Sequence, residues 1–358
     1  MFNWLTSLFS SKPKYFTGNL PDTRTDAEKQ KDWSHSEREI TTPADPFSNT
    51  QITTSPYFYE NQQYTSSCVP HGVGLALAIE RKADVGDYTR IAQMFPYRLR
   101  SNYPQEGSIL QNIFEIYRKE GAPLFTTLPT PMTEAQADAI QITSAQVNEA
   151  AIFKGFSYYT LTKNWNDIAT LGGIAALGHG VPILIYANDD EWGLDFPVIK
   201  YPNLTAGIAE IDHCVCILPN SGFTLNGKQY LTIQDSAWFG GKQLRHLDAD
   251  FLKARCFAAG YWDKVITLGS GPHPKYQFTK DLHYGDTGAD VKAMQQLFIA
   301  EGLLANNNAT GAFYGLTLAA LHAFQNKYAS QILMPNNLDK PTDTFGPSSR
   351  NVANKLCQ

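Results

Sequence analysis

A stretch of glycine and proline at residues 269–274 (GSGPHP) divides the chain into a large and a small part. Neither a helix nor a strand continues through glycine and proline at this density, so the stretch is predicted to be an exposed linker. The chain of 358 residues is long enough for one large and one small domain. We therefore expect a main domain over residues 15–268, a linker over 269–275 and a second domain over 276–358.

The composition indicates a globular protein and argues against nucleic acid as a partner. Hydrophobic residues make up 43% of the chain and charged residues 18%, which is ordinary for a protein with its own core. The net charge is −5, from 29 basic and 34 acidic residues, and no basic block occurs. No apolar run reaches the length of a transmembrane helix.

Residues 1–14 form a short apolar segment at the start of the chain. They lack the basic start and the long apolar run of a signal peptide, so synthesis in the cytoplasm is expected. The apolar side chains that fall on one helical face are Phe2, Leu5, Leu8 and Phe9. We interpret the segment as a terminal helix packed on its own domain, with docking to a partner or a membrane as the alternative.

Residues 62–72 (QQYTSSCVPHG) place a cysteine where a polar, extended run gives way to an apolar helix. Ser66 or Ser67 can cap that helix, and Pro70 is tolerated in its first turn. The thiol of Cys68 then meets the positive end of the helix dipole, which favours the thiolate. Cys68 is therefore a candidate nucleophile.

Two later segments supply a base and a carboxylate. Residues 211–218 (IDHCVCIL) are predicted to form a buried strand with His213 at its start. Residues 230–238 (YLTIQDSAW) are predicted to form a strand that ends at Asp235. Cysteine, histidine and an acid are the parts of a thiol acyl-transfer site, which needs no cofactor or metal.

Gln62 is a candidate for stabilising an oxyanion, because its amide can donate an N–H from a position six residues before Cys68. Gln63 would take this place only if the loop were one residue shorter. His71 lies one helical turn beyond the cysteine and is a second imidazole, for which we expect a surface or packing role.

Three other groups near the histidine have alternative interpretations. Asp212 is the rival of Asp235 as the acid that orients the imidazole. Cys214 and Cys216 could begin a zinc site, but no second pair of ligands has metal spacing, so we predict none. The cysteines of the chain show no disulfide framework, which fits a reducing compartment.

Together these motifs resemble the papain-like cysteine peptidases. The pattern of that family is a glutamine six residues before Ser-x-Cys, then (Val/Ile)-Asp-His, then Asn-Ser-Trp. The matching positions are Gln62, residues 66–68, residues 211–213 and residues 235–238. The resemblance covers about residues 15–268 and implies an α+β fold with two lobes and a substrate cleft between them.

Two weaker matches complete the resemblance. Residues 106–110 (EGSIL) are similar to the glycine wall of the family's cleft, which implies that Gly107 lines the substrate site. Residues 180–185 (GVPILI) are similar to the strand after the family's middle helix. The resemblance also implies that Trp238 shields the base from water or contacts the substrate.

The chain departs from the family pattern at three positions. Asp235 replaces the orienting asparagine, Ala237 is an extra residue before the tryptophan, and Val69 stands where tryptophan is usual. An aspartate can still hold the imidazole, and it stabilises an imidazolium more strongly than an amide does. We therefore expect catalysis to persist with different ion-pair energetics.

Helices are expected early in the main domain and strands late. The expected helices lie after Cys68 and at residues 109–120, 133–140 and 165–178, and the expected strands at residues 181–187, 213–218, 229–234 and 257–266.

The last part of the chain changes character. Three glycine-containing turns, in residues 282–291, 310–317 and 344–350, each lead into a predicted helix, which gives a small three-helix bundle. This part resembles the peptidoglycan-binding domain of many cell-wall hydrolases. Tyr314 replaces a glycine of that pattern, so the second turn must be reshaped, with Gly315 as a substitute.

The two resemblances together predict a lysin-like cysteine peptidase or amidase. The expected substrate is peptidoglycan or a cell-wall peptide, cut at the bacterial envelope by an enzyme that is phage-encoded or carried in a virion. The alternatives are a protease that acts on proteins at a cell surface, a transpeptidase, and a catalytically idle structural or virion component.

Overall fold

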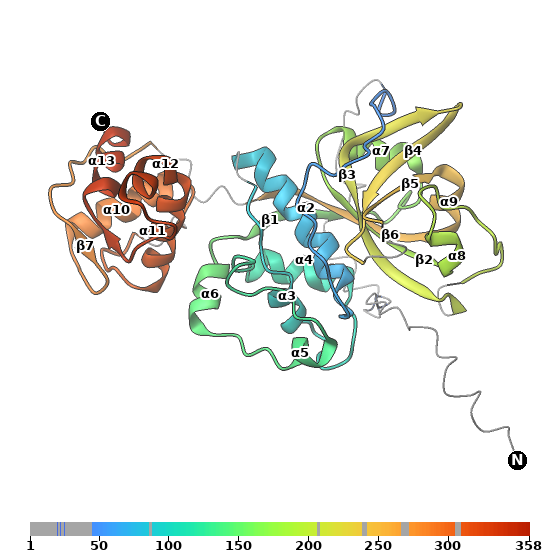
Figure 1. Cartoon of the computed structure of the whole chain (residues 1–358), viewed down its shortest axis with the longest axis horizontal. Coiled ribbons are helices and arrows are strands. Elements are labelled where there is room, and N and C mark those ends of the chain that lie inside the picture. Colours follow the sequence, from blue (N-terminus) through green and yellow to red (C-terminus); the bar gives the residue numbers. More distant parts are fainter. Residues whose placement is uncertain are drawn as a thin grey trace, which may run out of the picture.

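The structure, a computed structural model, describes residues 45–85, 88–205, 208–237, 242–265, 272–304 and 309–358, together with Leu20, Asp22 and Thr25. Three features expected from the sequence lie outside these residues: the segment 1–14, Trp238 and residues 269–271 of the linker. Figure 1 shows a larger part, with helices beside a sheet, and a smaller helical part that contains the C-terminus. No helix in the described part of the chain is long and apolar enough to cross a membrane.

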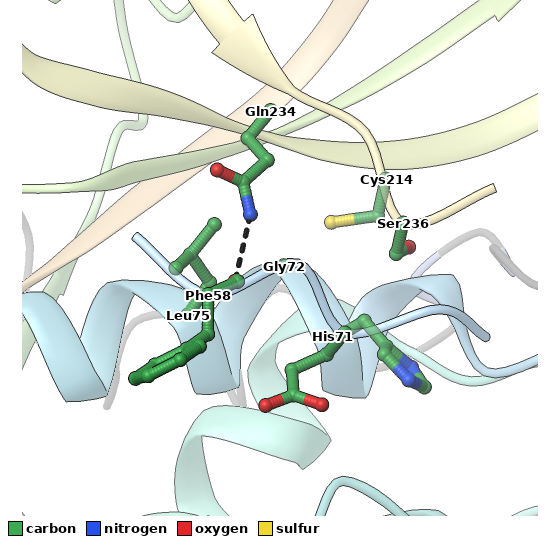
Figure 2. Close-up of a pocket in the computed structure, with 8 residues that line it drawn as sticks. Phe58, His71, Gly72, Leu75, Cys214, Gln234 and Ser236 are labelled. Atoms are coloured by element: carbon green, nitrogen blue, oxygen red, sulfur yellow. Dashed lines mark hydrogen bonds between the residues drawn. The ribbon is translucent and has the colours of Figure 1, made fainter. Parts of the chain in front are cut away.

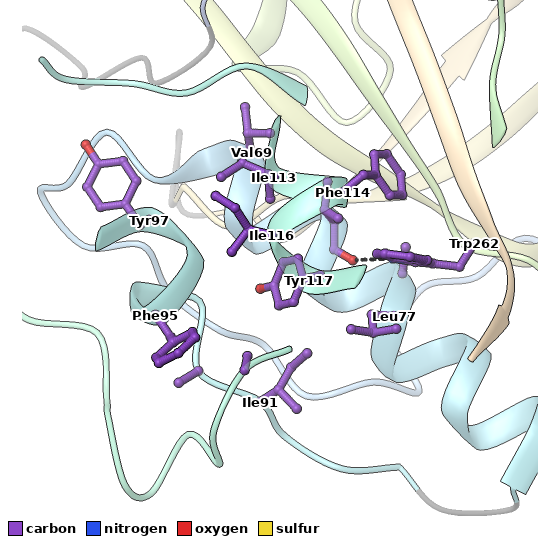
Figure 3. Close-up of a cluster of buried hydrophobic side chains, with 14 of the residues drawn as sticks. Val69, Leu77, Ile91, Phe95, Tyr97, Ile113, Phe114, Ile116, Tyr117 and Trp262 are labelled. Carbon is purple, nitrogen blue, oxygen red and sulfur yellow. Dashed lines mark hydrogen bonds between the residues drawn. The ribbon is translucent and has the colours of Figure 1, made fainter. Parts of the chain in front are cut away.

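Helix α2 (Cys68–Val85) is the central helix of the larger part. Its residues are apolar around most of its surface, so it is buried on several sides rather than on one face. One side packs on α4 (Leu110–Lys119), where Val69 and Leu77 meet the aromatic residues Phe114 and Tyr117 (Figure 3). The other side contacts the sheet.

The sheet has six strands in the order β1-β6-β2-β3-β4-β5, and every neighbouring pair is antiparallel. The last strand in the chain, β6, therefore lies inside the sheet, between β1 and β2. The strands are β1 (Gly155–Thr160), β2 (Val181–Ala187), β3 (Ile211–Leu225), β4 (Lys228–Gln234), β5 (Leu244–Asp248) and β6 (Cys256–Val265).

The sheet separates two hydrophobic cores, because successive side chains of a strand point to opposite faces. On β3, Cys214 and Cys216 belong to the core around α2, whereas Val215 and Ile217 belong to the core on the other face. Helix α7 (Ile168–Ala176) covers that second core. Strand β3 is thus buried on both faces, which explains why its sequence is a continuous apolar run.

Gly72 allows α2 to approach β3 closely. A Cβ atom at this position would lie 2.7 Å from the Sγ atom of Cys214, closer than side chains normally pack. The close approach brings the first turn of α2 against the strand that begins with His213. The packing of these two elements therefore sets the distance between the sequence-predicted nucleophile and base.

Each helix and strand predicted for the main domain has a counterpart, but the sequence missed several elements. Strands β1 and β5 were not expected, nor were the helices α3 (Met94–Arg98), α6 (Ser144–Ala150), α8 (Asp189–Trp192) and α9 (Ala249–Arg255). The predicted helix at 133–140 is the short α5 (Glu134–Asp138). Helices α5 and α6 each begin with a capping box, in which Thr133 and Thr143 accept a backbone N–H.

The smaller part contains α10 (Ala289–Ala300), α11 (Gly315–Lys327) and α13 (Pro347–Leu356). It also contains the short helix α12 (Ala329–Ile332), a 3₁₀ turn and a two-stranded sheet of β7 (Leu282–His283) and β8 (Thr344–Phe345), none of which was predicted. Its core is aromatic, and it includes Phe278, Phe298, Phe313, Phe324 and Phe345.

Two buried glutamines hold equivalent turns in this smaller part. The amide of Gln295 donates to Thr317 Oγ1 at 2.8 Å and accepts the N–H of Gly311 at 2.7 Å. The amide of Gln325 donates to a backbone carbonyl at 3.0 Å and accepts the N–H of Thr342 at 2.6 Å. Gln295 thereby attaches α10 to the turn at Gly311, and Gln325 attaches α11 to the turn at Thr342.

Tyr314 occupies the N-cap of α11 with φ −123°, an extended conformation that any residue adopts. The positive φ of this turn belongs to Gly311, at 76°, so the turn needs no glycine at 314. Tyr314 is 53% exposed, and its ring lies 5.7 Å from that of Tyr284, which is also exposed.

Candidate active site

Cys68 is the first residue of α2 and is fully buried. The loop before it is tied down by two acids from distant parts of the chain. The N–H of Ser66 donates to Glu134 Oε2 at 2.6 Å, and its hydroxyl donates to Glu106 Oε2 at 3.1 Å. Tyr97 also donates to the carboxylate of Glu134. No local pattern predicts these contacts, because neither acid is near the cysteine in the chain.

His213 lies at the start of β3 and is fully buried. Its Nε2 atom lies 2.6 Å from Asp235 Oδ1, and the thiol of Cys68 lies near enough to the imidazole to influence its pKa. The structure thus brings together the three residues predicted as nucleophile, base and orienting acid. Of the two candidate acids, Asp235 and not Asp212 bonds to the imidazole.

The electrostatics of the site favour a charged imidazole. Burial by itself lowers the pKa of His213, but the charge and hydrogen bond of Asp235, together with Cys68, outweigh burial and raise the pKa to about 10. Burial raises the pKa of Asp235, but the charges of His213 and Arg245 outweigh it, so this pKa is lowered. Burial alone raises the pKa of Asp212 to about 6.

Two residues that the sequence did not identify also bond to Asp235. Trp192 donates its Nε1–H to Oδ2 at 3.0 Å, and Arg245 donates from Nη1 to the same oxygen at 2.6 Å. Both side chains are fully buried. Arg245 lies on β5, whose short alternating sequence LRHLD is typical of a surface strand, so no local pattern indicated that its charge would be internal.

Gln62 is buried and joins the loop before α2 to the end of β4. Its Nε2–H donates to the carbonyl of Thr65 at 2.9 Å, and its Oε1 accepts the hydroxyl of Ser236 at 2.8 Å. Its backbone N–H donates to the carbonyl of Ser236 at 3.0 Å. Gln63, the alternative, has a left-handed backbone with φ 54° and is less buried.

Gly107 lies in the loop before α4 with φ 79°, where a residue with a side chain would be strained. Its carbonyl accepts an N–H of Asn102 at 2.9 Å. The next residue, Ser108, accepts the backbone N–H of Leu20 at 3.0 Å, so part of the N-terminal region lies against this loop. Trp238, the other predicted substrate residue, lies outside the described part of the chain.

His71 is buried one turn after Cys68, and the contacts of its imidazole do not suit a role as acid or base. Its Nδ1 lies 2.8 Å from the carbonyl of Ser67, and its Nε2 lies 3.3 Å from Thr130 Oγ1. Burial lowers the pKa of His71 to about 4, so it is neutral at physiological pH.

A small cavity lies between α2 and the ends of β3 and β4 (Figure 2). Its volume is about 20 Å³, enough for one water molecule. The residues that line it are Phe58, Glu60, His71, Gly72, Leu75, Cys214, Gln234 and Ser236. Within the residues that the structure describes, no group of three or more His, Cys, Asp or Glu side chains could hold a metal ion.

Comparison with known proteins agrees with this arrangement at the level of the fold. No protein-family model matches the sequence, and no curated protein matches it either. Among solved structures, the chain is similar to xylellain, a cysteine protease from Xylella fastidiosa, with a TM-score of 0.53 and 15% identity over 70% of this chain and 97% of that one. It is also similar to digestive procathepsin L 3 from the larval midgut of Tenebrio molitor, with a TM-score of 0.50 and 13% identity over 70% of this chain and 76% of that one. The larger part of the chain therefore has the fold of the papain-like cysteine proteases.

Proposed function

We propose that the protein is a cysteine peptidase or amidase that uses Cys68, His213 and Asp235. The observation that carries the proposal is a buried group of three side chains, in which the thiol of Cys68 lies near the imidazole of His213 and the imidazole bonds to the carboxylate of Asp235. A nucleophile, a base and a group that orients the base, each within hydrogen-bond reach of the next, are what thiol acyl transfer requires.

The reaction begins with transfer of the thiol proton of Cys68 to His213. The thiolate sulfur attacks the carbonyl carbon of a peptide bond, and the carbonyl oxygen becomes an oxyanion. The backbone N–H of Cys68 and the amide of Gln62 donate to that oxyanion.

His213 completes both halves of the reaction. The imidazolium gives its proton to the leaving amine as the C–N bond breaks, which leaves an acyl group on the sulfur of Cys68. A water molecule then loses a proton to His213 and attacks the thioester. The C–S bond breaks, the carboxylic acid leaves, and the thiol is restored.

We further propose that the substrate is a peptide of the bacterial cell wall. The support is the similarity of residues 282–291 and 310–325 to the peptidoglycan-binding pattern, together with the compact C-terminal unit that these residues help to form. A wall-binding unit would raise the local concentration of wall peptides around the peptidase. A phage or virion origin stays a prediction from the sequence.

The test is digestion of purified cell wall, with products analysed by mass spectrometry. The wild-type chain should release fragments with new amino termini, and Cys68→Ala should release none while melting at the wild-type temperature. Cleavage of casein without cleavage of wall would favour the cell-surface protease. Inactivity on both substrates, with no labelling of Cys68 by an electrophile at neutral pH, would favour the idle structural component.

A further inference from the structure

The Asp235 carboxylate accepts four hydrogen bonds, two on each oxygen. Oδ1 accepts from His213 Nε2 at 2.6 Å and from the backbone N–H of Ala237 at 2.8 Å. Oδ2 accepts from Trp192 Nε1 at 3.0 Å and from Arg245 Nη1 at 2.6 Å. Each of these four described groups is a donor.

An ionised carboxylate fits this environment, and an amide does not. Both oxygens of a carboxylate accept, whereas an asparagine has one accepting and one donating end. With its oxygen on the His213 side, an asparagine would point its N–H₂ group at the donors of Trp192 and Arg245. This explains why position 235 carries aspartate where the papain-like pattern has asparagine.

Arg245 supplies the charge that makes a buried aspartate possible. The arginine is fully buried, and its Nε–H donates to the carbonyl of Trp192 at 2.7 Å. Its guanidinium lies 4.7 Å from the centre of the Trp192 ring. These contacts hold the guanidinium in one place, so its interaction with Asp235 is fixed in direction as well as in charge.

We infer that Arg245 is a positioning residue of the proposed reaction. It balances the charge of Asp235 and fixes the carboxylate so that Oδ1 stays on His213. Once the thiol proton of Cys68 has moved to His213, the site contains two buried ion pairs in line, Cys68 with His213 and Asp235 with Arg245, whose four charges sum to zero. This inference rests on the proposed function, because it assigns Arg245 a role in orienting the base.

The inference predicts whether replacing Arg245 lowers or raises the stability of the protein, depending on the residue at position 235. In the wild-type chain, replacing Arg245 removes one of the two counter-charges of the buried Asp235 carboxylate, the other being His213, which is unfavourable. In an Asp235→Asn background, Arg245 has lost the carboxylate to which it bonds, so replacing this buried charge should be favourable. If Arg245 only packed on Trp192 and bonded to its carbonyl, replacing it would be unfavourable in both backgrounds.

The experiment compares the full-length wild type with R245Q, R245K, D235N and the double variant D235N/R245Q. Two properties are measured: the melting temperature, and the rate at which iodoacetamide alkylates Cys68, followed by peptide mapping. R245Q should slow alkylation about tenfold or more, and R245K should recover most of the rate because it retains the charge. The double variant should melt above D235N and react no more slowly than D235N.

A lower melting temperature for the double variant than for D235N would overturn the inference, as would a wild-type alkylation rate in R245Q. If R245Q fails to fold, the melting temperatures of D235N and the double variant still test whether Arg245 balances the charge of Asp235. If the wild type hydrolyses neither wall nor casein, the proposed function fails. The melting comparison then still tests the charge balance on its own.

Discussion

Gly72 is a position where one methyl group should test the packing that joins the nucleophile to its base. In an isolated helix, Gly→Ala stabilises by about 1 kcal/mol. At Gly72 the new Cβ atom would lie 2.7 Å from Cys214 Sγ, and Cys214 is fully buried on β3, beside a cavity of only about 20 Å³. Overpacking of this kind costs about 1–3 kcal/mol. We expect Gly72→Ala to lower the free energy of unfolding by about 1–2 kcal/mol, because the clash outweighs the helix propensity.

Removal of the sulfur should reverse the effect of the methyl group. Cys214→Ala alone should cost about 1–2 kcal/mol, since it deletes a buried atom. In that background Gly72→Ala meets no sulfur and fills part of the space, so it should stabilise by about 1 kcal/mol. The double-mutant cycle would then show a favourable coupling of about 2–3 kcal/mol.

Urea unfolding followed by far-UV circular dichroism, with the four proteins at one pH, measures this coupling. The reasoning is refuted if Gly72→Ala has the same sign and size with and without the sulfur of Cys214. The alkylation rate of Cys68 provides a second readout, because displacement of α2 from β3 moves the thiol away from His213.

The other predictions concern the site and the C-terminal unit. Gln62→Ala should lower kcat about 10²-fold with little change in KM, as found when one oxyanion donor is removed, which steady-state kinetics on the scissile wall peptide would check. The pKa of His213 is lowered by burial but raised more strongly by Asp235 and Cys68, from 6.5 to about 10, so its contribution to stability is complete below about pH 6.5 and is lost as the pH rises through about 10. Melting curves across this range should therefore show falling stability, and Asp235→Asn should flatten the dependence; an unchanged slope would contradict the assignment. Gln295→Leu should destabilise the C-terminal unit by about 1–2 kcal/mol, because it leaves the partly buried N–H of Gly311 without its acceptor, and calorimetry would detect this as a lower transition temperature.

The sequence was sufficient for the parts of the site that carry local patterns. Cys68 follows a helix-start motif, His213 begins an apolar strand, and Asp235 ends another strand, so each was recognisable from its immediate neighbours. The fold class followed from the same motifs and from the order of helices and strands.

The sequence was not sufficient for residues whose role depends on distant contacts. Arg245 and Trp192 are 53 positions apart in the chain, on β5 and α8, and they meet only in the folded chain. The burial of Arg245 cannot be predicted from β5, because the residues beside it in this short strand include other polar ones. Gly72 gave no indication of its role either, because the close approach of α2 to β3 exists only in the folded chain.

The position of β6 inside the sheet has a consequence for synthesis of the protein. Strand β6 pairs with both β1 and β2, yet it is the last strand of this sheet to leave the ribosome. Cys68, His213 and Asp235 are all translated earlier, but the sheet that supports two of them lacks an internal member until residue 265 has emerged. Until residue 265 has emerged, the nascent chain therefore cannot complete the sheet that supports the proposed reactive centre.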